Sequence, residues 1–134
     1  MSDSNANGQP ARSALVVEDE PLISEYLTAC LEQLGYQVRD ANNAADALAI
    51  ARREGGFSVA FVDLGLPDHP GLELIVALQA QMPQIRIVIA SGYGDMALRD
   101  TGWDGQVTVL SKPFDHDMVA NALAQLGLGS GAAG

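Results

Sequence analysis

The sequence predicts an α/β domain built around a mainly parallel β-sheet. Two features of the 134-residue chain predict it: short apolar runs with the length of buried strands, and helical segments with one apolar face that separate these runs. Strands that alternate with helices are joined by crossover connections, which make neighbouring strands parallel and cover both faces of the sheet. The length is sufficient for one domain with a buried core.

The first half of the chain contains two expected strands and two expected helices in alternation. The strands are residues 14–17 and 36–40. Pro21, a residue type favoured in the first turn of a helix, begins a helix that continues to about Leu34 and ends at Gly35. Asn43 can cap a second helix, which stops at Gly55-Gly56. The apolar faces of these helices comprise Ile23, Leu27, Cys30, Leu31 and Leu34 in the first, and Ala44, Ala47, Leu48 and Ala51 in the second.

Three expected strands and the remaining helices follow in the second half. The strands are residues 57–62, 85–90 and 107–110. A helix over 71–82 ends before Pro83, and Asp115 can cap a last helix. The inward residues of that last helix are Met118, Val119, Ala122, Leu123 and Leu126. Several glycines make residues 92–105 poor helix material, so we expect a fourth helix there to be short or irregular.

The two ends of the chain indicate the domain organisation and the cellular compartment of the protein. We expect residues 1–13 and 127–134 to be flexible tails around a domain over 14–126, with no output domain attached. The N-terminus lacks the apolar segment of a secretory signal, and no apolar run approaches the roughly 20 residues that cross a bilayer. We therefore expect a cytoplasmic protein.

Charge and cysteine content exclude several classes of function. The formal net charge of −10 argues against direct binding of nucleic acid or of an anionic membrane surface, which need basic patches, and it permits a cation or a basic protein partner. Cys30 is the single cysteine, so the domain has no internal disulfide. Its position on an apolar helix face favours a small buried hydrophobe over a reactive thiol.

Chemically active side chains follow four of the expected strands. They are Glu18-Asp19-Glu20 after the first strand, Asp63 after the third, Ser91 after the fourth, and Lys112, the only lysine, after the fifth. Because the carboxyl ends of parallel strands lie at one edge of a sheet, we expect carboxylates, a hydroxyl and an ammonium to meet there. Each residue alone has an ordinary explanation, such as a helix cap, a turn or a loop, so the prediction depends on their joint occurrence.

Such a cluster is suited to phosphoryl chemistry. Carboxylates repel one another unless a cation lies among them, and hard oxygen ligands in a partly hydrated site suit Mg²⁺. A carboxylate beside such a cation can act as a nucleophile and form an aspartyl phosphate. The metal, a hydroxyl and an ammonium can then each bind one phosphoryl oxygen.

Four motifs, taken in order and spacing, resemble those of the receiver domains of bacterial response regulators. They are Val17-Glu18-Asp19-Glu20-Pro21, Val62-Asp63-Leu64-Gly65-Leu66-Pro67, Ala90-Ser91-Gly92 and Ser111-Lys112-Pro113-Phe114. The resemblance runs from about Leu15 to Leu126. It implies a flavodoxin-like (βα)5 domain whose parallel strands have the order 2-1-3-4-5.

The resemblance also implies a metal site. By motif position, Asp63 would accept the phosphoryl group and bind Mg²⁺, and Asp19 would be a direct ligand. The backbone carbonyl of Gly65 would be the third protein ligand. Glu18 would act mainly through a metal-bound water, because it is one methylene longer than the commoner aspartate.

Two further side chains would bind the phosphoryl group. The resemblance implies that Ser91 bonds one phosphoryl oxygen and that Lys112 pairs with the group. The Lys112–Pro113 peptide bond is cis in this family, which an X–Pro bond tolerates. One position departs from the family pattern: Val109 stands where most members have Tyr or Phe, so the usual aromatic switch residue is missing.

The segment after the fourth strand offers another switch element. Ile89-Ala90-Ser91-Gly92-Tyr93 partly resembles the Phe-Ala-Thr-Gly-aromatic motif of a subgroup of single-domain receivers. We hypothesise that the 92–105 segment, with Tyr93 and Trp103, is the element that moves on phosphorylation. The alternative is that both aromatic side chains only pack on the sheet.

The resemblance implies a stand-alone response regulator of a two-component system or phosphorelay. Its phosphoryl group would come from a sensor histidine kinase or a histidine phosphotransferase, and its signal would go to an unidentified downstream protein. It would have no enzymatic activity apart from its own phosphotransfer and autodephosphorylation.

The sequence fits three other functions less well. A phosphorylation-independent interaction domain is disfavoured, because the acidic, hydroxyl and lysine residues are all present. A Mg²⁺-dependent phosphatase is less expected, because Gly65 stands where such enzymes carry an acid/base aspartate two residues after the nucleophile. A nucleotide- or flavin-binding domain would need a Gly-rich phosphate loop after the first strand, which this sequence lacks.

Overall fold

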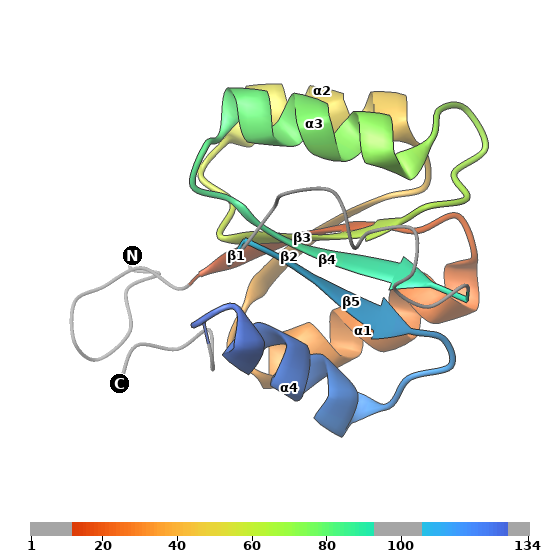
Figure 1. The fold of residues 1–134 in the computed structure, drawn as a ribbon, viewed down its shortest axis with the longest axis vertical. Helices are drawn as coiled ribbons and strands as arrows, with labels where there is room; N and C mark the ends of the chain where they lie inside the picture. Colours follow the sequence, from red (N-terminus) through yellow and green to blue (C-terminus); the bar gives the residue numbers. More distant parts are fainter. Residues whose placement is uncertain (1–11, 93–105, 129–134) are drawn as a thin grey trace.

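The computed structural model describes residues 12–92 and 106–128, which form a five-stranded sheet between two layers of helices (Figure 1). The strands are β1 (Ser13–Val17), β2 (Gln37–Ala41), β3 (Val59–Asp63), β4 (Arg86–Ser91) and β5 (Val107–Ser111). Their order is β2-β1-β3-β4-β5, and every neighbouring pair is parallel. The predicted α/β class and the implied strand order are confirmed.

Among the described residues, two helices cover each face of the sheet. They are α1 (Pro21–Gln33), α2 (Ala44–Glu54), α3 (Gly71–Gln81) and α4 (His116–Gln125). Figure 1 shows α2 and α3 on one face and α1 and α4 on the other. Successive strand residues alternate between the two cores: Leu15 packs with α2 and α3, and Val16 with α1 and α4. Both faces of the central strands β1, β3 and β4 are buried, which is why these strands read as apolar runs, whereas the edge strand β2 carries the exposed residues Gln37, Arg39 and Asp40.

The strands β3 and β4 each reach one residue further than the sequence suggests. Asp63 pairs with Ala90, and Ser91 pairs with Ser111, so both Asp63 and Ser91 belong to the sheet and not to the loops that follow. The ladder therefore holds their backbones at the carboxyl edge.

The helix α4 has the expected cap but not the complete expected inward face. Asp115 Oδ1 accepts the N–H of Met118 at 2.9 Å. The prediction that Met118 lies inward is wrong, because its side chain is 36% exposed. It lines a surface groove along β5, the last strand of the sheet, where no further strand among the described residues covers it. Val119, Ala122 and Leu123 are buried as expected.

Three other expectations concern Cys30, membrane-spanning helices and the segment after β4. Cys30 is buried on α1, as expected for a small hydrophobe. In the part of the chain that the structure describes, no helix combines the length and the apolar character needed to span a membrane. Tyr93, Trp103 and the expected fourth helix lie outside the described residues.

Candidate functional site at the carboxyl edge of the sheet

Three carboxylates converge at the carboxyl edge of the sheet. Glu18 and Asp19 directly follow β1, and Asp63 is the last residue of β3, the strand beside β1. One carboxylate oxygen from each residue lies within 4.8 Å of the other two. The structure thus brings together the acidic residues that the sequence places at the ends of separate strands.

This carboxylate cluster (Glu18, Asp19 and Asp63) is closed on one side and open on the other. Glu18 is 3% exposed and Asp63 is 9% exposed, whereas Asp19 lies on the surface. The backbone N–H of Glu18 donates to the carbonyl of Ala41 at 3.0 Å, and its Oε2 accepts the N–H of Glu20 at 3.3 Å. Glu18 is therefore a fixed, buried member of a cluster that solvent reaches at Asp19.

Lys112 provides the positive charge in the cluster. Its Nζ lies 3.0 Å from Glu18 Oε1, 3.6 Å from Asp63 Oδ1 and 3.8 Å from Glu20 Oε1. One ammonium thus neighbours three carboxylates, so negative charge remains in excess at the site.

Burial and charge perturb two of these groups. Burial raises the pKa of Glu18 to about 7 and the charge of Asp63 adds to this, while Lys112 and the Glu20 N–H only partly oppose it. Burial by itself lowers the pKa of Lys112, but the contact with Glu18 and the charges of Asp63 and Glu20 outweigh it and raise that pKa. Lys112 is therefore an ammonium at neutral pH, whereas Glu18 is close to its midpoint.

The donor set fits a hard divalent cation. Glu18 Oε1 is buried and accepts no hydrogen bond of ordinary geometry from the described residues, although Lys112 Nζ is nearby. A group of carboxylate oxygens with excess negative charge and one solvent-facing side is the environment in which Mg²⁺ or Ca²⁺ binds.

The raised pKa of Glu18 should make the stability of the metal-free protein depend on pH. Because this pKa is about 7 in the folded protein and 4.5 in an ordinary glutamate, the folded state binds more protons between these values. The free energy of unfolding should therefore fall as pH rises through this range, by on the order of 1 to 3 kcal/mol. Urea unfolding at several pH values, in the presence of a chelator, measures this dependence. The free energy of unfolding should vary less with pH in Glu18→Gln than in the wild type, and an equal dependence on pH in both proteins would contradict the prediction.

Ser91 lies at the same edge, on the strand between those of Asp63 and Lys112. It is the last residue of β4 and is 2% exposed, and its neighbour Ala90 pairs with Asp63. Its carbonyl accepts the backbone N–H of Lys112 at 3.0 Å. The Lys112–Pro113 bond is cis, as the resemblance implied.

Val109, the position of the missing aromatic, is half-buried on β5. It pairs with Ile89 and packs against the core beneath α2 and α3. Because Tyr93 and Trp103 lie outside the described residues, the hypothesis of a moving 92–105 segment stays a prediction.

Two residues that follow β3 were not predicted to matter: Asp68 in the loop and Gly71 at the start of α3. A Cβ atom on Gly71 would lie 2.5 Å from the carbonyl oxygen of Asp63 and 2.8 Å from Leu64 Cα, so only glycine fits there. A glycine in the first turn of a helix is unfavourable by itself, and that was the available signal. Asp68 contacts the start of α2, which no local pattern indicates.

An apolar groove adjoins the carboxylate cluster. Its volume is about 370 Å³, and it is lined by Leu22, Ile23, Tyr26, Lys112, Pro113 and Phe114. Leu22 is 80% exposed, and the rings of Tyr26 and Phe114 lie 6.2 Å apart. Lys112 therefore borders both the groove and the cluster.

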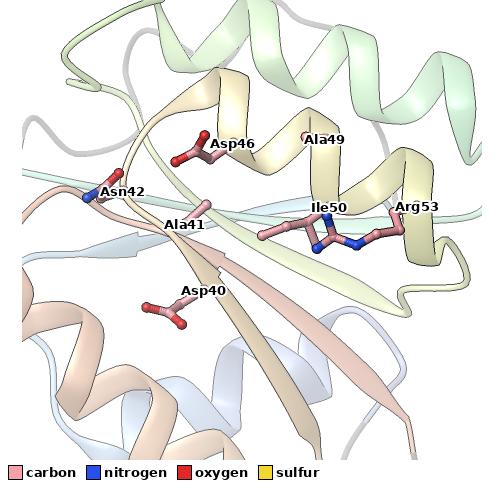
Figure 2. Close-up of a pocket in the computed structure, with 7 residues that line it drawn as sticks. All are labelled: Asp40, Ala41, Asn42, Asp46, Ala49, Ile50 and Arg53. Carbon is pink, nitrogen blue, oxygen red and sulfur yellow. The ribbon is translucent and has the colours of Figure 1, made fainter.

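A separate hollow of about 370 Å³ lies between the end of β2 and α2. Figure 2 shows Asp40 at the strand and Asp46 and Arg53 on the helix. None of its lining residues belongs to the carboxylate cluster.

Sequence comparison identifies relatives of this chain. The family profile of the response regulator receiver domain matches residues 14–124. The photosynthetic apparatus regulatory protein RegA of Rhodobacter capsulatus is 34% identical over 117 residues, which are 87% of this chain and 63% of RegA. The chain thus spans less than two thirds of the length of this relative.

Solved structures agree with this comparison. The CheY-like receiver domain from Methylobacillus flagellatus is 30% identical with a TM-score of 0.76, over 87% of this chain and 98% of that one. A response regulator from Burkholderia pseudomallei, whose structure contains a phosphorylated aspartic acid, a calcium ion and citrate, is 33% identical with a TM-score of 0.72, over 84% and 66%. The chain therefore belongs to the response regulator receiver domains, signalling domains that catalyse no reaction apart from their own phosphotransfer.

Proposed function

We propose that this receiver accepts a phosphoryl group on Asp63 from a phosphohistidine of a kinase or phosphotransferase, in a Mg²⁺-dependent reaction. The observation that carries the proposal is the position of Lys112 Nζ, 3.6 Å from Asp63 Oδ1 and beside three clustered carboxylates. Negative charge on the phosphoryl oxygens would be met by an ammonium on one side and by a metal on the other.

The protein side chains have distinct roles in this transfer. A bond forms between an Asp63 carboxylate oxygen and phosphorus while the P–N bond of the donor breaks, and the imidazole leaves with the electron pair. The N–H of Gly65 donates to Asp63 Oδ1 at 3.1 Å and orients this carboxylate. Lys112 pairs with one phosphoryl oxygen, and the hydroxyl of Ser91 donates to another.

The metal would be held by Asp19, Asp63 and the Gly65 carbonyl, with Glu18 acting through a water. Mg²⁺ bound there would neutralise the carboxylates and the phosphoryl oxygens. The calcium ion and the phosphorylated aspartic acid of the Burkholderia pseudomallei relative support this assignment. Gly65 has no side chain to act as acid or base, which favours a lasting aspartyl phosphate over phosphatase turnover.

Intact mass spectrometry after incubation with Mg²⁺ and a small acyl phosphate tests the proposal. We expect the mass to increase by one phosphoryl group, and we expect no increase for Asp63→Ala or in the presence of a chelator. Asp40→Ala, which removes a carboxylate at the end of β2 outside the cluster, should behave like the wild type (Figure 2). Release of inorganic phosphate without an adduct would favour a phosphatase, and no reaction with any donor would favour a phosphorylation-independent domain.

The phosphorylated form would signal through a protein contact or pass the phosphoryl group on.

We propose that the donor protein docks on the apolar groove beside Lys112. Asp63 is nearly buried, so a donor imidazole has to approach along the edge that Lys112 borders. The exposed Leu22 offers this donor an apolar contact next to that edge.

Leu22→Ser should therefore slow transfer from a protein donor by roughly tenfold, because it removes apolar surface that the bound donor would bury. Uptake from a small acyl phosphate should not change. The control is Val76→Ser, which changes an exposed apolar residue on α3, on the opposite face of the sheet. Equal slowing with both kinds of donor would show that Leu22 affects the domain itself and would contradict docking at the groove.

A further inference from the structure

The loop between β3 and α3 is attached to α2 by one carboxylate. Asp68 Oδ1 accepts the N–H of Ala44 at 2.9 Å, and Asp68 Oδ2 accepts the N–H of Ala45 at 3.0 Å. The hydrogen bond from Ala44, and then that from Ala45, lowers the pKa of Asp68, so this carboxylate is ionised at neutral pH. Both oxygens of Asp68 therefore accept hydrogen bonds from the start of a helix, more than twenty residues earlier in the chain.

The helix α2 already has a local cap. The first amides of a helix lack partners within the helix. Asn43 Oδ1 accepts the N–H of Asp46 at 2.8 Å, and the Asn43 carbonyl accepts that of Ala47 at 3.2 Å. Because Asn43 provides the usual capping contact, we attribute to Asp68 a second effect, which is to restrain the loop that carries it.

The beginning of that loop carries the proposed metal ligand Gly65. Its N–H is bonded to Asp63 Oδ1 at 3.1 Å, and the next residue, Leu66, is buried in the core beneath α2 and α3. Residues 67–70 are exposed, and Asp68 provides the side-chain hydrogen bonds that the structure shows for them. Without Asp68, this stretch would be held mainly at its two ends.

The helix α2 is a rigid support for such a contact. Ala44, Ala47 and Ala51 are completely or almost completely buried against the core that also contains Leu15 and Val17 of β1. The strand β1 leads directly into Glu18 and Asp19. Asp68 therefore joins the loop after Asp63 to a helix packed against the strand that carries the other carboxylates.

We infer that Asp68 is a positioning residue for metal binding: its two hydrogen bonds hold the 64–70 loop against α2 and thereby keep the backbone of Gly65 in place beside Asp63. The inference rests on the proposed metal role of the carboxylate cluster. Asp68 does not bind the metal itself, so its effect passes through the loop backbone.

Calorimetric Mg²⁺ titration and amide hydrogen exchange of the full chain test this inference. Asp68→Ala should weaken Mg²⁺ binding roughly tenfold, as is typical when a supporting contact of a metal site is lost, and should speed exchange at the Gly65 amide. Asp68→Asn keeps one acceptor oxygen and should lie between Asp68→Ala and the wild type. The matched control is Asn43→Ala, which removes the other cap of α2 and should leave both readouts within about twofold of the wild type.

Two results would overturn the inference. The first is wild-type Mg²⁺ affinity in Asp68→Ala. The second is an equal loss of affinity in Asn43→Ala, which would show that Asp68 acts only as a cap of α2. If the wild type takes up phosphate and the Asp68 variants bind Mg²⁺ as tightly as the wild type, only this inference is contradicted and the proposed function stands. A wild-type chain that binds no Mg²⁺ would overturn the proposed function, and the role of Asp68 in metal binding with it; exchange at Gly65 would then still show whether Asp68 restrains the loop.

Discussion

Lys112→Ala should slow phosphoryl uptake by about two to three orders of magnitude, the usual cost of losing one group that stabilises transition-state charge. Lys112 is the cation nearest to Asp63 Oδ1 among the described residues, and it is the only lysine of the chain. Initial rates of phosphoryl uptake from a small acyl phosphate at saturating Mg²⁺ measure the effect. Arg53→Ala, which removes an exposed cation on α2, is the control and should react at the wild-type rate.

The same variant should separate the roles of charge and fold. Without Lys112, Glu18 loses its 3.0 Å ion pair, so its pKa should rise above about 7 and it should be protonated at neutral pH. Protonation limits the loss of stability. Removal of a competing ammonium and protonation of Glu18 have opposite effects on metal binding, so the affinity of the site for Mg²⁺ should change little. Normal Mg²⁺ binding with slow uptake is the expected pattern; a wild-type rate of uptake would contradict the assigned role of Lys112.

Gly71→Ala should lower the free energy of unfolding by about 2 to 4 kcal/mol, although alanine is ordinarily the better helix former by about 1 kcal/mol. The added Cβ would meet the Asp63 carbonyl oxygen at 2.5 Å and Leu64 Cα at 2.8 Å. Both are backbone atoms and cannot rotate away, so α3 or the end of β3 has to shift. Since β3 ends on Asp63, Mg²⁺ binding should weaken as well.

Urea unfolding and Mg²⁺ titration measure both effects of this substitution. Gly92→Ala is the matched control, because a Cβ there meets no atom of residues 12–92 and 106–128 within 4 Å and the change should stay within about 0.5 kcal/mol. A Gly71→Ala protein as stable as the wild type, or more stable, would show that the close approach to Asp63 is relieved without cost.

Most of the fold follows from local chemistry and could be read from the sequence. Pro21 and the caps at Asn43 and Asp115 set helix starts through contacts within one turn, and they are where the sequence places them. The apolar strands required helices on both faces of a parallel sheet. Parallel strands then required that Asp63 and Lys112 lie at one edge.

Prediction from the sequence is less accurate where segments that are distant along the chain pack against each other. The ends of β3 and β4 depend on pairing with a neighbour, so Asp63 and Ser91 proved to be strand residues. Met118 was expected inward because helical periodicity reports which side of a helix is apolar, not where the sheet beside it stops.

The sequence by itself determined which expected strands are followed by carboxylates, a hydroxyl and an ammonium, because residue type and position along the chain are properties of the sequence. Only the tertiary structure decided how deeply Glu18 is buried and how close Lys112 comes to it, and these two quantities set the raised pKa. The tertiary structure also decided the contacts of Gly71 with the end of β3 and of Asp68 with α2. The physical reason is the same in each case: these distances result from the packing of strands and helices that are far apart in the sequence, which no spacing along the chain specifies.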